Sequence, residues 1–218
     1  MSSPTRARSA TGRSIVVGVA GGSGSGKSTV VHEVVRTLGR DTVTVIQHDA
    51  YYRDLSHLSF EERVRTNFDH PDSLETELLV QHLTRLVAGE VVEVPSYDFA
   101  SHTRLARSRC VAPSPLVVLD GILVLADARL RSLLDYSVYV HAGPEERLAR
   151  RIDRDTSDRG RSRESVVEQF ERSVRPMHEH WVEPSRVHAD MTILEGGYNR
   201  EAVGRLVQTL NGLLSLRA

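Results

Sequence analysis

The 218-residue chain is poor in cysteine, in lysine and in long apolar runs, and each scarcity excludes a class of protein. Cys110 is its one cysteine, so no internal disulfide can form and a reducing, cytoplasmic location is expected. No run approaches the roughly 20 apolar residues that a membrane-spanning helix needs, which argues against a membrane protein. The 28 Lys and Arg balance 29 Asp and Glu, so general binding to nucleic acid or to an anionic membrane is not expected.

Residues 1–13 are rich in Ser, Thr, Ala and Arg and contain no acidic residue. Such a segment has nothing with which to anchor itself to a core, so we expect a disordered tail. A short organelle transit peptide is the alternative interpretation. Lysine is as scarce as cysteine. Of the 28 basic side chains, 27 are arginine, and Lys27 alone is lysine.

From Ser14 onward, short apolar runs alternate with longer helical stretches. The runs favour five strands buried on both faces, at 14–20, 42–47, 116–119, 136–140 and 191–194. The stretches between them predict helices at 27–38, 74–88, 145–153, 164–180 and 201–216, the second opened by a capping box of Asp72 and Glu75. This alternation predicts an α/β fold, a parallel five-stranded sheet between two layers of helices.

One segment interrupts the alternation. Two short strands at 91–94 and 109–112 flank the residues 95–99 and predict a β-hairpin, about 90–113, that projects from the sheet. Because no repeat or linker is present, residues 14–218 are expected to form a single domain.

The segment from Gly21 to Ser28 matches G-x-x-x-x-G-K-[ST], directly after the first predicted strand and at the start of a helix. Its glycines let backbone N–H groups converge on a phosphate, while Lys27 adds a mobile charge and Ser28 a hydroxyl for Mg²⁺. We therefore expect the phosphates of a nucleotide to bind here. The expected nucleotide-binding residues are the loop and the first helical turn: Gly21, Gly22, Ser23, Gly24, Ser25, Gly26, Lys27, Ser28 and Thr29.

Two acids stand at the carboxyl ends of predicted strands, where open α/β sheets place their ligands. Asp120 ends the strand 116–119 and is expected to hold Mg²⁺ together with Ser28, directly or through water. Asp49 follows the second strand and is the candidate general base for transfer to a hydroxyl. A Ras-like switch is excluded, since its N-K-x-D base-recognition sequence needs a lysine and Lys27 belongs to the phosphate loop.

Arginines recur on one face of the fourth predicted helix and continue beyond it. Their spacing suits a lid, about 145–175, that closes over phosphates and neutralises charge developing during transfer. A solvated face paired with neighbouring acids is the alternative. These arginines are Arg147, Arg150, Arg151, Arg154, Arg159, Arg161 and Arg163.

With these parts assembled, the chain resembles the uridine kinase (uridine-cytidine kinase) family over residues 15 to about 200. Seven ordered motifs carry the resemblance: GGSGSGKS from Gly21, HDAYYRD from His48, NFDHPDS from Asn67, PSYDFASHTR from Pro95, DGIL from Asp120, RRIDRDTSDRGR from Arg150 and VRPMHEHWVEPS from Val174. The resemblance implies a three-layer phosphate-loop kinase fold and a homotetramer. It also implies transfer of the γ-phosphate of ATP or GTP to the 5′-hydroxyl of uridine or cytidine, in pyrimidine salvage.

The same resemblance implies roles for single residues. Asp49 resembles the family's base, with Lys27, Arg154 and Arg159 acting on the transferred phosphate. Asp69 and Arg151 resemble the pair that holds the ribose. One carboxylate can accept hydrogen bonds from both ribose hydroxyls. The implied substrate-binding residues are Tyr52, Asp69, Tyr97, Phe99, His102, Arg151, Arg161 and Gln169.

Two other functions stay open at this point. A related kinase could phosphorylate a sugar phosphate or pantothenate, although the residues expected to hold a diol and a pyrimidine argue against it. A catalytically silent nucleotide-binding regulator is the other, which the presence of Asp49, Asp120 and the lid arginines disfavours.

Overall fold

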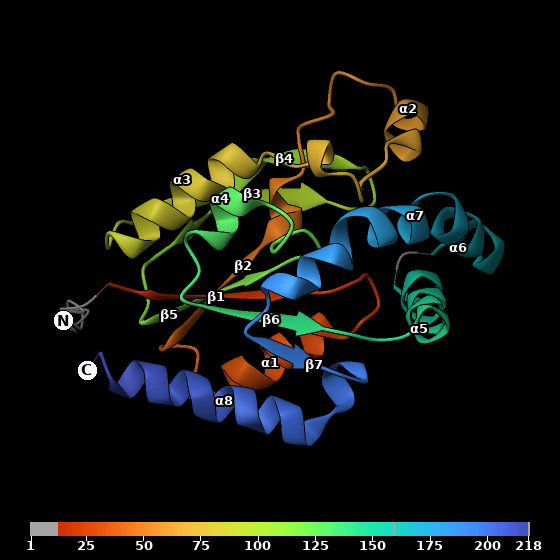
Figure 1. Ribbon diagram of the computed structural model, residues 1–218. Helices are drawn as coiled ribbons and strands as arrows, with labels where there is room; N and C mark the ends of the chain where they lie inside the picture. The colour runs from red at the N-terminus through yellow and green to blue at the C-terminus, as the bar shows by residue number, and fades with distance from the viewer. Residues whose placement is uncertain (1–12, 159, 218) are drawn as a thin grey trace, which may run out of the picture.

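A sheet of five parallel strands forms the centre of the computed structural model, which describes residues 13–158 and 160–217 (Figure 1). The strand order is β2-β5-β1-β6-β7. The strands are β1 (Ile15–Ala20), β2 (Val43–Gln47), β5 (Leu116–Asp120), β6 (Tyr136–Val140) and β7 (Met191–Ile193). The predicted α/β fold with a five-stranded parallel sheet is confirmed. Apart from Arg13, the predicted tail lies outside the described residues, and the domain limits stay a prediction.

Helices cover both faces of the sheet because both faces of its strands are apolar. Helices α1 (Lys27–Leu38) and α8 (Arg200–Ser215) lie on one face, and α3 (Thr76–Val87) and the short α4 (Ala128–Arg131) lie on the other (Figure 1). Neighbouring residues of β1 point to opposite faces: Val17 packs in the cluster of α1 and α8, and Val16 in that of α3. This arrangement gives the predicted three layers.

The hairpin lies within its predicted limits of about 90–113, but its two strands are longer than predicted. Strands β3 (Val92–Asp98) and β4 (Thr103–Val111) pair antiparallel and project beside α2 (Phe60–Arg65) (Figure 1). The prediction that residues 95–99 connect the strands is wrong, since Tyr97 pairs with Arg104. Pro95 is tolerated because it lies at a register shift in a two-stranded sheet, where a missing N–H interrupts little.

The predicted helix 164–180 is interrupted. Helix α5 (Pro144–Ser157) is followed by α6 (Arg163–Gln169), and π-helical turns at Phe170–Val174 and His178–Val182 flank the short α7 (Arg175–Met177). Pro176 lies in that short helix and has no N–H to donate to the preceding turn, so regular α-helical bonding cannot run through it.

The predicted capping box of Asp72 and Glu75 is also wrong. Asp72 lies in a 3₁₀ turn (Pro71–Ser73), and Glu75, at the N-cap of α3, makes no side-chain cap. Its backbone N–H instead donates to Tyr51 O at 2.8 Å, which fastens the start of α3 to the 3₁₀ turn (His48–Tyr51) that follows β2. A capping box instead joins Ser59 and Glu62 at α2, a helix that the sequence analysis did not predict.

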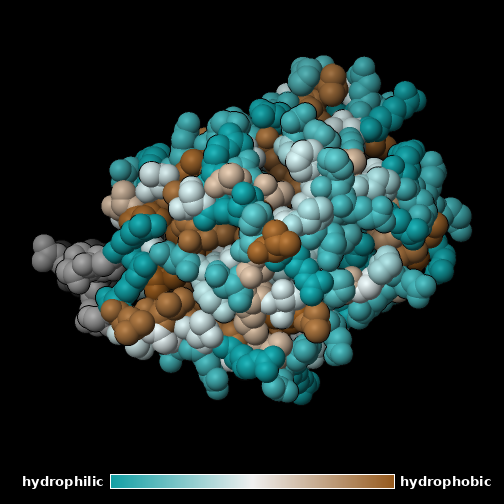
Figure 2. All heavy atoms as spheres, viewed as in Figure 1, coloured by the Kyte–Doolittle hydropathy of each residue, from teal (hydrophilic) through white to brown (hydrophobic). Residues whose placement is uncertain are grey.

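The surface seen in Figure 2 is mostly hydrophilic, with its apolar side chains in separate small groups. Among the described residues, no helix combines the length and the apolar character needed to cross a bilayer.

One buried and one largely buried histidine make the stability of the fold sensitive to acid. Burial lowers the pKa of His48 to about 4, and burial together with the charge of Arg147 does the same for His178. Unfolding returns each to an ordinary value near 6.5, so the unfolded chain binds more protons between these limits. The free energy of unfolding is therefore largest above about pH 6.5 and falls toward pH 4 by roughly 2 to 3 kcal/mol for each histidine.

Urea titrations across this pH range measure the effect. We expect His48→Gln to reduce the slope of the free energy of unfolding against pH by the contribution of about one proton, because it removes one of the two histidines. The exposed His57→Gln is the control and should leave the slope unchanged. An equal slope in His48→Gln and the wild type would contradict the assignment.

Candidate active site

The phosphate loop connects β1 to α1 in a backbone path that only glycine can follow. Gly21, Gly24 and Gly26 have φ angles of 138°, 81° and 95°. A Cβ on Gly21 would lie 2.2 Å from Val140 O, and one on Gly24 would lie 2.4 Å from Arg147 O. Glycine is thus required both by the left-handed backbone and by the close approach of β6 and α5.

A cavity of about 620 Å³ opens in front of this loop, at the carboxyl ends of the strands. Lys27 and Ser28 line it from α1, and Asp49 and Asp120 line it from the ends of β2 and β5. Arg150 and Arg154 of α5 line it as well. The cavity therefore joins the predicted nucleotide loop, the predicted base and two of the lid arginines.

Charges of both signs meet at the loop. Burial lowers the pKa of Lys27, and the charges of Asp120 and Asp49 oppose that shift. Burial raises the pKa of Asp120, which Lys27 lowers and Asp49 raises further. Lys27 Nζ donates to Gly22 O at 3.1 Å. The charge of Lys27 favours the ionised carboxylate of Asp120, and the carboxylates favour the charged lysine in return. A bound polyphosphate would favour the charged lysine further.

Two hard oxygen donors at the cavity wall suit a magnesium ion. Ser28 and Asp120 both line the cavity, and the hydroxyl of Ser28 favours the charged form of the Asp120 carboxyl, which lowers its pKa. Among residues 13–158 and 160–217, no three His, Cys, Asp or Glu side chains form a protein-only metal cage. Mg²⁺ commonly takes one or two protein oxygens together with water and substrate phosphates, so this donor set fits it.

A second carboxylate and an arginine lie deeper, next to Asp49. Burial raises the pKa of Asp69, Arg151 lowers it, and Asp49 raises it. Arg151 is 6% exposed, and burial lowers its pKa against the opposing charge of Asp69. Its Nη1 donates to Ser23 Oγ at 2.8 Å and its Nη2 to Gln169 Oε1 at 3.0 Å. This guanidinium thus connects the phosphate loop, the predicted ribose carboxylate and α6.

Aromatic rings of the hairpin and its neighbours surround this region. Tyr52 lies 5.2 Å from both Phe68 and Tyr97, centroid to centroid. His102 stacks on Phe68 at 5.1 Å with 16° between the planes, and its own φ of 51° turns the tip of the hairpin. The Tyr97 hydroxyl is buried with no hydrogen-bond partner among the described residues, and burial raises its pKa to about 12. An unpartnered buried hydroxyl beside aromatic faces suits a planar polar ligand.

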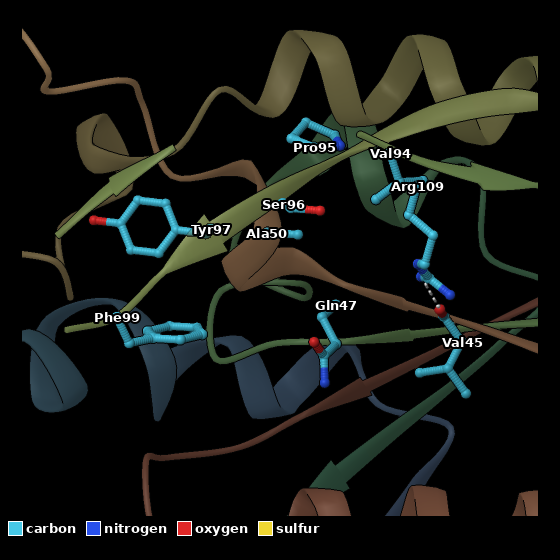
Figure 3. A pocket seen from close by; sticks show the side chains of 9 residues that line it. All are labelled: Val45, Gln47, Ala50, Val94, Pro95, Ser96, Tyr97, Phe99 and Arg109. Atoms are coloured by element: carbon cyan, nitrogen blue, oxygen red, sulfur yellow. Dashed lines mark hydrogen bonds between the residues drawn. The ribbon is translucent and has the colours of Figure 1, made fainter. Parts of the chain in front are cut away.

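A smaller hollow of about 360 Å³ lies between the hairpin and the edge strand β2 (Figure 3). Gln47 and Phe99 line both this hollow and the larger cavity. Arg109 closes its far side by donating to Val45 O at 3.2 Å. Phe99 therefore stands at the boundary between the two spaces.

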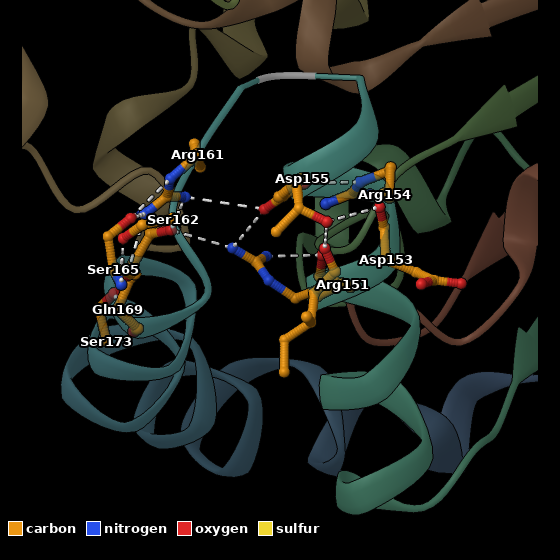
Figure 4. A network of polar contacts seen from close by, with 12 residues as sticks. Arg151, Asp153, Arg154, Asp155, Arg161, Ser162, Ser165, Gln169 and Ser173 are labelled. Atoms are coloured by element: carbon orange, nitrogen blue, oxygen red, sulfur yellow. Dashed lines mark hydrogen bonds and ion pairs between the residues drawn. The ribbon is translucent and has the colours of Figure 1, made fainter.

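The arginine face of α5 contacts the phosphate loop. Arg147 is 2% exposed, and Arg150 Nη1 donates to Ser25 O at 3.2 Å while its guanidinium lies 4.8 Å from the Tyr198 ring centroid. The alternative of a solvated face is wrong for Arg147 and Arg151. Arg161 Nη1 donates to Gln169 Oε1 at 2.6 Å (Figure 4). Arg159 lies outside the described residues.

The described members of the predicted site thus gather at one end of the sheet, and their individual roles stay predictions. Phe68, Ile122 and Tyr198 line or border the site and were missed. Two of them had a local signal, because Phe68 precedes Asp69 in the same motif and Ile122 follows Asp120 by two positions. Tyr198 lies in a short glycine-rich turn that gave no reason to single out its ring.

Comparisons with known proteins agree with this geometry. A uridine kinase of Clostridium perfringens is 44% identical over 202 residues, 93% of this chain and 97% of that protein. A uridine kinase of Brevibacillus brevis is 47% identical over 203 residues, covering 93% and 95%. A solved structure from Silicibacter, named for a fructose transport system kinase, matches 83% of this chain and 90% of its own with a TM-score of 0.71. At 23% identity, that likeness shows the fold alone.

The family described as "Phosphoribulokinase / Uridine kinase family" matches residues 16–201. That range contains the phosphate loop, the hairpin, the arginines of α5 and α6, and both strand-end carboxylates. The chain belongs to the phosphoribulokinase and uridine kinase family.

Proposed function

We propose that the protein is a uridine kinase that transfers the γ-phosphate of ATP or GTP to the 5′-hydroxyl of uridine, and of cytidine. The products are UMP and CMP, formed in pyrimidine salvage. Relatives named uridine kinase, 44% and 47% identical over nearly their whole length, support the acceptor. The observation that carries the proposal is Asp49, which lines the cavity with Lys27 and acts electrostatically on both Lys27 and Asp69.

Asp49 would act as the general base. Phosphoryl transfer has a loose transition state, so a carboxylate mainly orients the attacking hydroxyl and accepts its proton late. Lys27 and Arg154 line the same cavity and supply positive charge to the oxygens of the transferring group. The predicted role of Arg159 beside them is part of this proposal.

The nucleoside would occupy the space between the hairpin and α6. Asp69 can accept hydrogen bonds from both ribose hydroxyls, held in place by the neighbouring Arg151. The buried Tyr97 hydroxyl, His102, Arg161 and Gln169 supply polar groups for the pyrimidine edge. Phe68 and Phe99 offer aromatic surface to the ring.

Mg²⁺ bound with the nucleotide would neutralise phosphate charge, and Ser28 and Asp120 are the residues that would hold it. We further propose a cytoplasmic enzyme, consistent with its single cysteine, and a homotetramer, which rests on family resemblance alone. Residues 14–218 would act as one domain, with about 145–175 closing over the substrates.

A panel of acceptors tests the proposed reaction. Purified protein is incubated with ATP and Mg²⁺ and with uridine, cytidine, ribulose 5-phosphate or pantothenate, and products are detected by mass. We expect UMP and CMP. Phosphorylation of ribulose 5-phosphate or pantothenate instead would replace this function with that of a related kinase, and no transfer to any acceptor would favour a silent regulator.

Asp49→Asn tests the base. The amide keeps the shape of the side chain and cannot take the proton, so kcat should fall by roughly 10²- to 10⁴-fold while ATP still binds. The matched control is Asp41→Asn, because Asp41 is exposed in the turn that precedes β2, whereas Asp49 lies in the turn that follows it. Steady-state kinetics and calorimetric nucleotide binding measure both variants, and wild-type kcat in Asp49→Asn would exclude the assignment.

The ribose contact predicts discrimination against 2′-deoxyuridine. Loss of one hydroxyl leaves a buried carboxylate oxygen unpaired, which should lower kcat/KM by roughly 5- to 150-fold relative to uridine. Asp69→Asn should reduce this ratio, whereas Asp72→Asn, exposed in the same motif, should preserve it. Equal kcat/KM for the two nucleosides in the wild type would show that Asp69 does not hold the diol.

A further inference from the structure

A single buried carboxylate lies between the arginines of α5 and α6. The side chain of Asp155, in the last turn of α5, is 0% exposed. Arg154 Nε donates to its Oδ1 at 2.8 Å, whereas Arg151 Nη2 and Arg161 Nη1 lie 3.6 Å and 3.7 Å from its Oδ2 (Figure 4). The backbone N–H of Arg161 also donates to Asp155 O at 3.0 Å. One carboxylate thus contacts three guanidinium groups.

The two oxygens of Asp155 face different halves of the site. Arg154, bonded to Oδ1, lines the cavity in front of the phosphate loop, where the donor would lie. Arg151 and Arg161, near Oδ2, both donate to Gln169 Oε1, and Arg151 acts on Asp69. Donor-side and acceptor-side arginines therefore meet at opposite oxygens of one rigid, planar group.

Asp155 does not line either cavity, so it is not placed to touch a substrate. A buried ion pair is weak grounds for a purely stabilising role, because desolvation offsets much of its attraction. Arginine side chains have many rotamers, and holding three of them in register requires a fixed acceptor. A buried carboxylate with two divergent oxygens meets that requirement.

We propose that Asp155 is a positioning residue for phosphoryl transfer, which fixes the donor-side guanidinium of Arg154 relative to the acceptor-side guanidiniums of Arg151 and Arg161. The inference rests on the proposed function and adds to it a physical connection between the two substrates. When a triphosphate orders Arg154, the shared carboxylate orders Arg151 and Arg161 as well. Nucleotide and nucleoside therefore bind with positive coupling.

Asp155→Asn tests the connection. The asparagine amide keeps the shape of the side chain but has only one oxygen that can accept. Its NH₂ group would face the N–H groups of either Arg154 or the pair Arg151 and Arg161. We expect kcat to fall on the order of 10- to 100-fold, since small misplacement of aligned groups has effects of that size. Nucleotide binding alone should weaken much less than kcat falls, because Lys27 and the loop would still hold the triphosphate and only Arg154 on that side is bonded to Asp155.

The coupling is measured by calorimetry of uridine with and without a non-hydrolysable ATP analogue. In the wild type the analogue should tighten uridine binding, and in Asp155→Asn the two affinities should be equal. The matched control is Asp135→Asn, because Asp135 also serves two partners with its two oxygens, Val16 N and Arg217 Nη2, outside the site. The Asp135→Asn variant should be less stable than the wild type but keep the wild-type kcat and the wild-type coupling between uridine and the ATP analogue.

Asp155→Glu keeps the test decisive if the amide variant does not fold. Its carboxylate restores the charge but lies one methylene farther out, so we expect a folded protein with reduced kcat and weakened coupling. If the wild type is active and either Asp155→Asn or Asp155→Glu keeps the wild-type kcat and coupling, this inference is overturned and the proposed function is not. A wild type that forms no UMP would overturn the proposed function, and this inference with it.

Discussion

The site depends on keeping one partly buried lysine charged. Burial lowers the pKa of Lys27, and the carboxylates of Asp120 and Asp49 counteract that shift. Parallel pairing of β2 with β5 sets Gln47 opposite Asp120, so two adjacent strands end beside the same loop. The cation, its two counter-charges and the cavity therefore follow from the order of the strands.

A second constraint joins the halves of the site through arginine. Arg151 reaches Ser23 in the phosphate loop and Gln169 in α6, and it lies in the field of Asp69. Its neighbour Arg150 on α5 donates to the backbone carbonyls of Gly24 and Ser25 in the same loop. Movement of α5 and α6 toward a nucleotide would consequently be felt at the acceptor side, which is the behaviour that transfer without hydrolysis requires.

Local signals were sufficient for part of this architecture. The phosphate loop, α1 and β6 match their predicted bounds, because glycine spacing and β-branched runs act over a few residues. Long-range contacts decided the rest. Pro95 lies inside β3 because that strand pairs with β4, and the backbone N–H of Glu75 donates to Tyr51 O instead of taking part in a capping box with Asp72. Phe68 joins the site through His102, a contact that sequence spacing cannot reveal.

The most direct test is a crystal structure of the protein with uridine, Mg²⁺ and a non-hydrolysable ATP analogue. The account predicts the triphosphate in the glycine loop and the 5′-oxygen of uridine between the Asp49 carboxylate and the γ-phosphorus, nearly in line with the bond that breaks. A 5′-oxygen directed away from Asp49, or a triphosphate bound elsewhere than the loop, would contradict it.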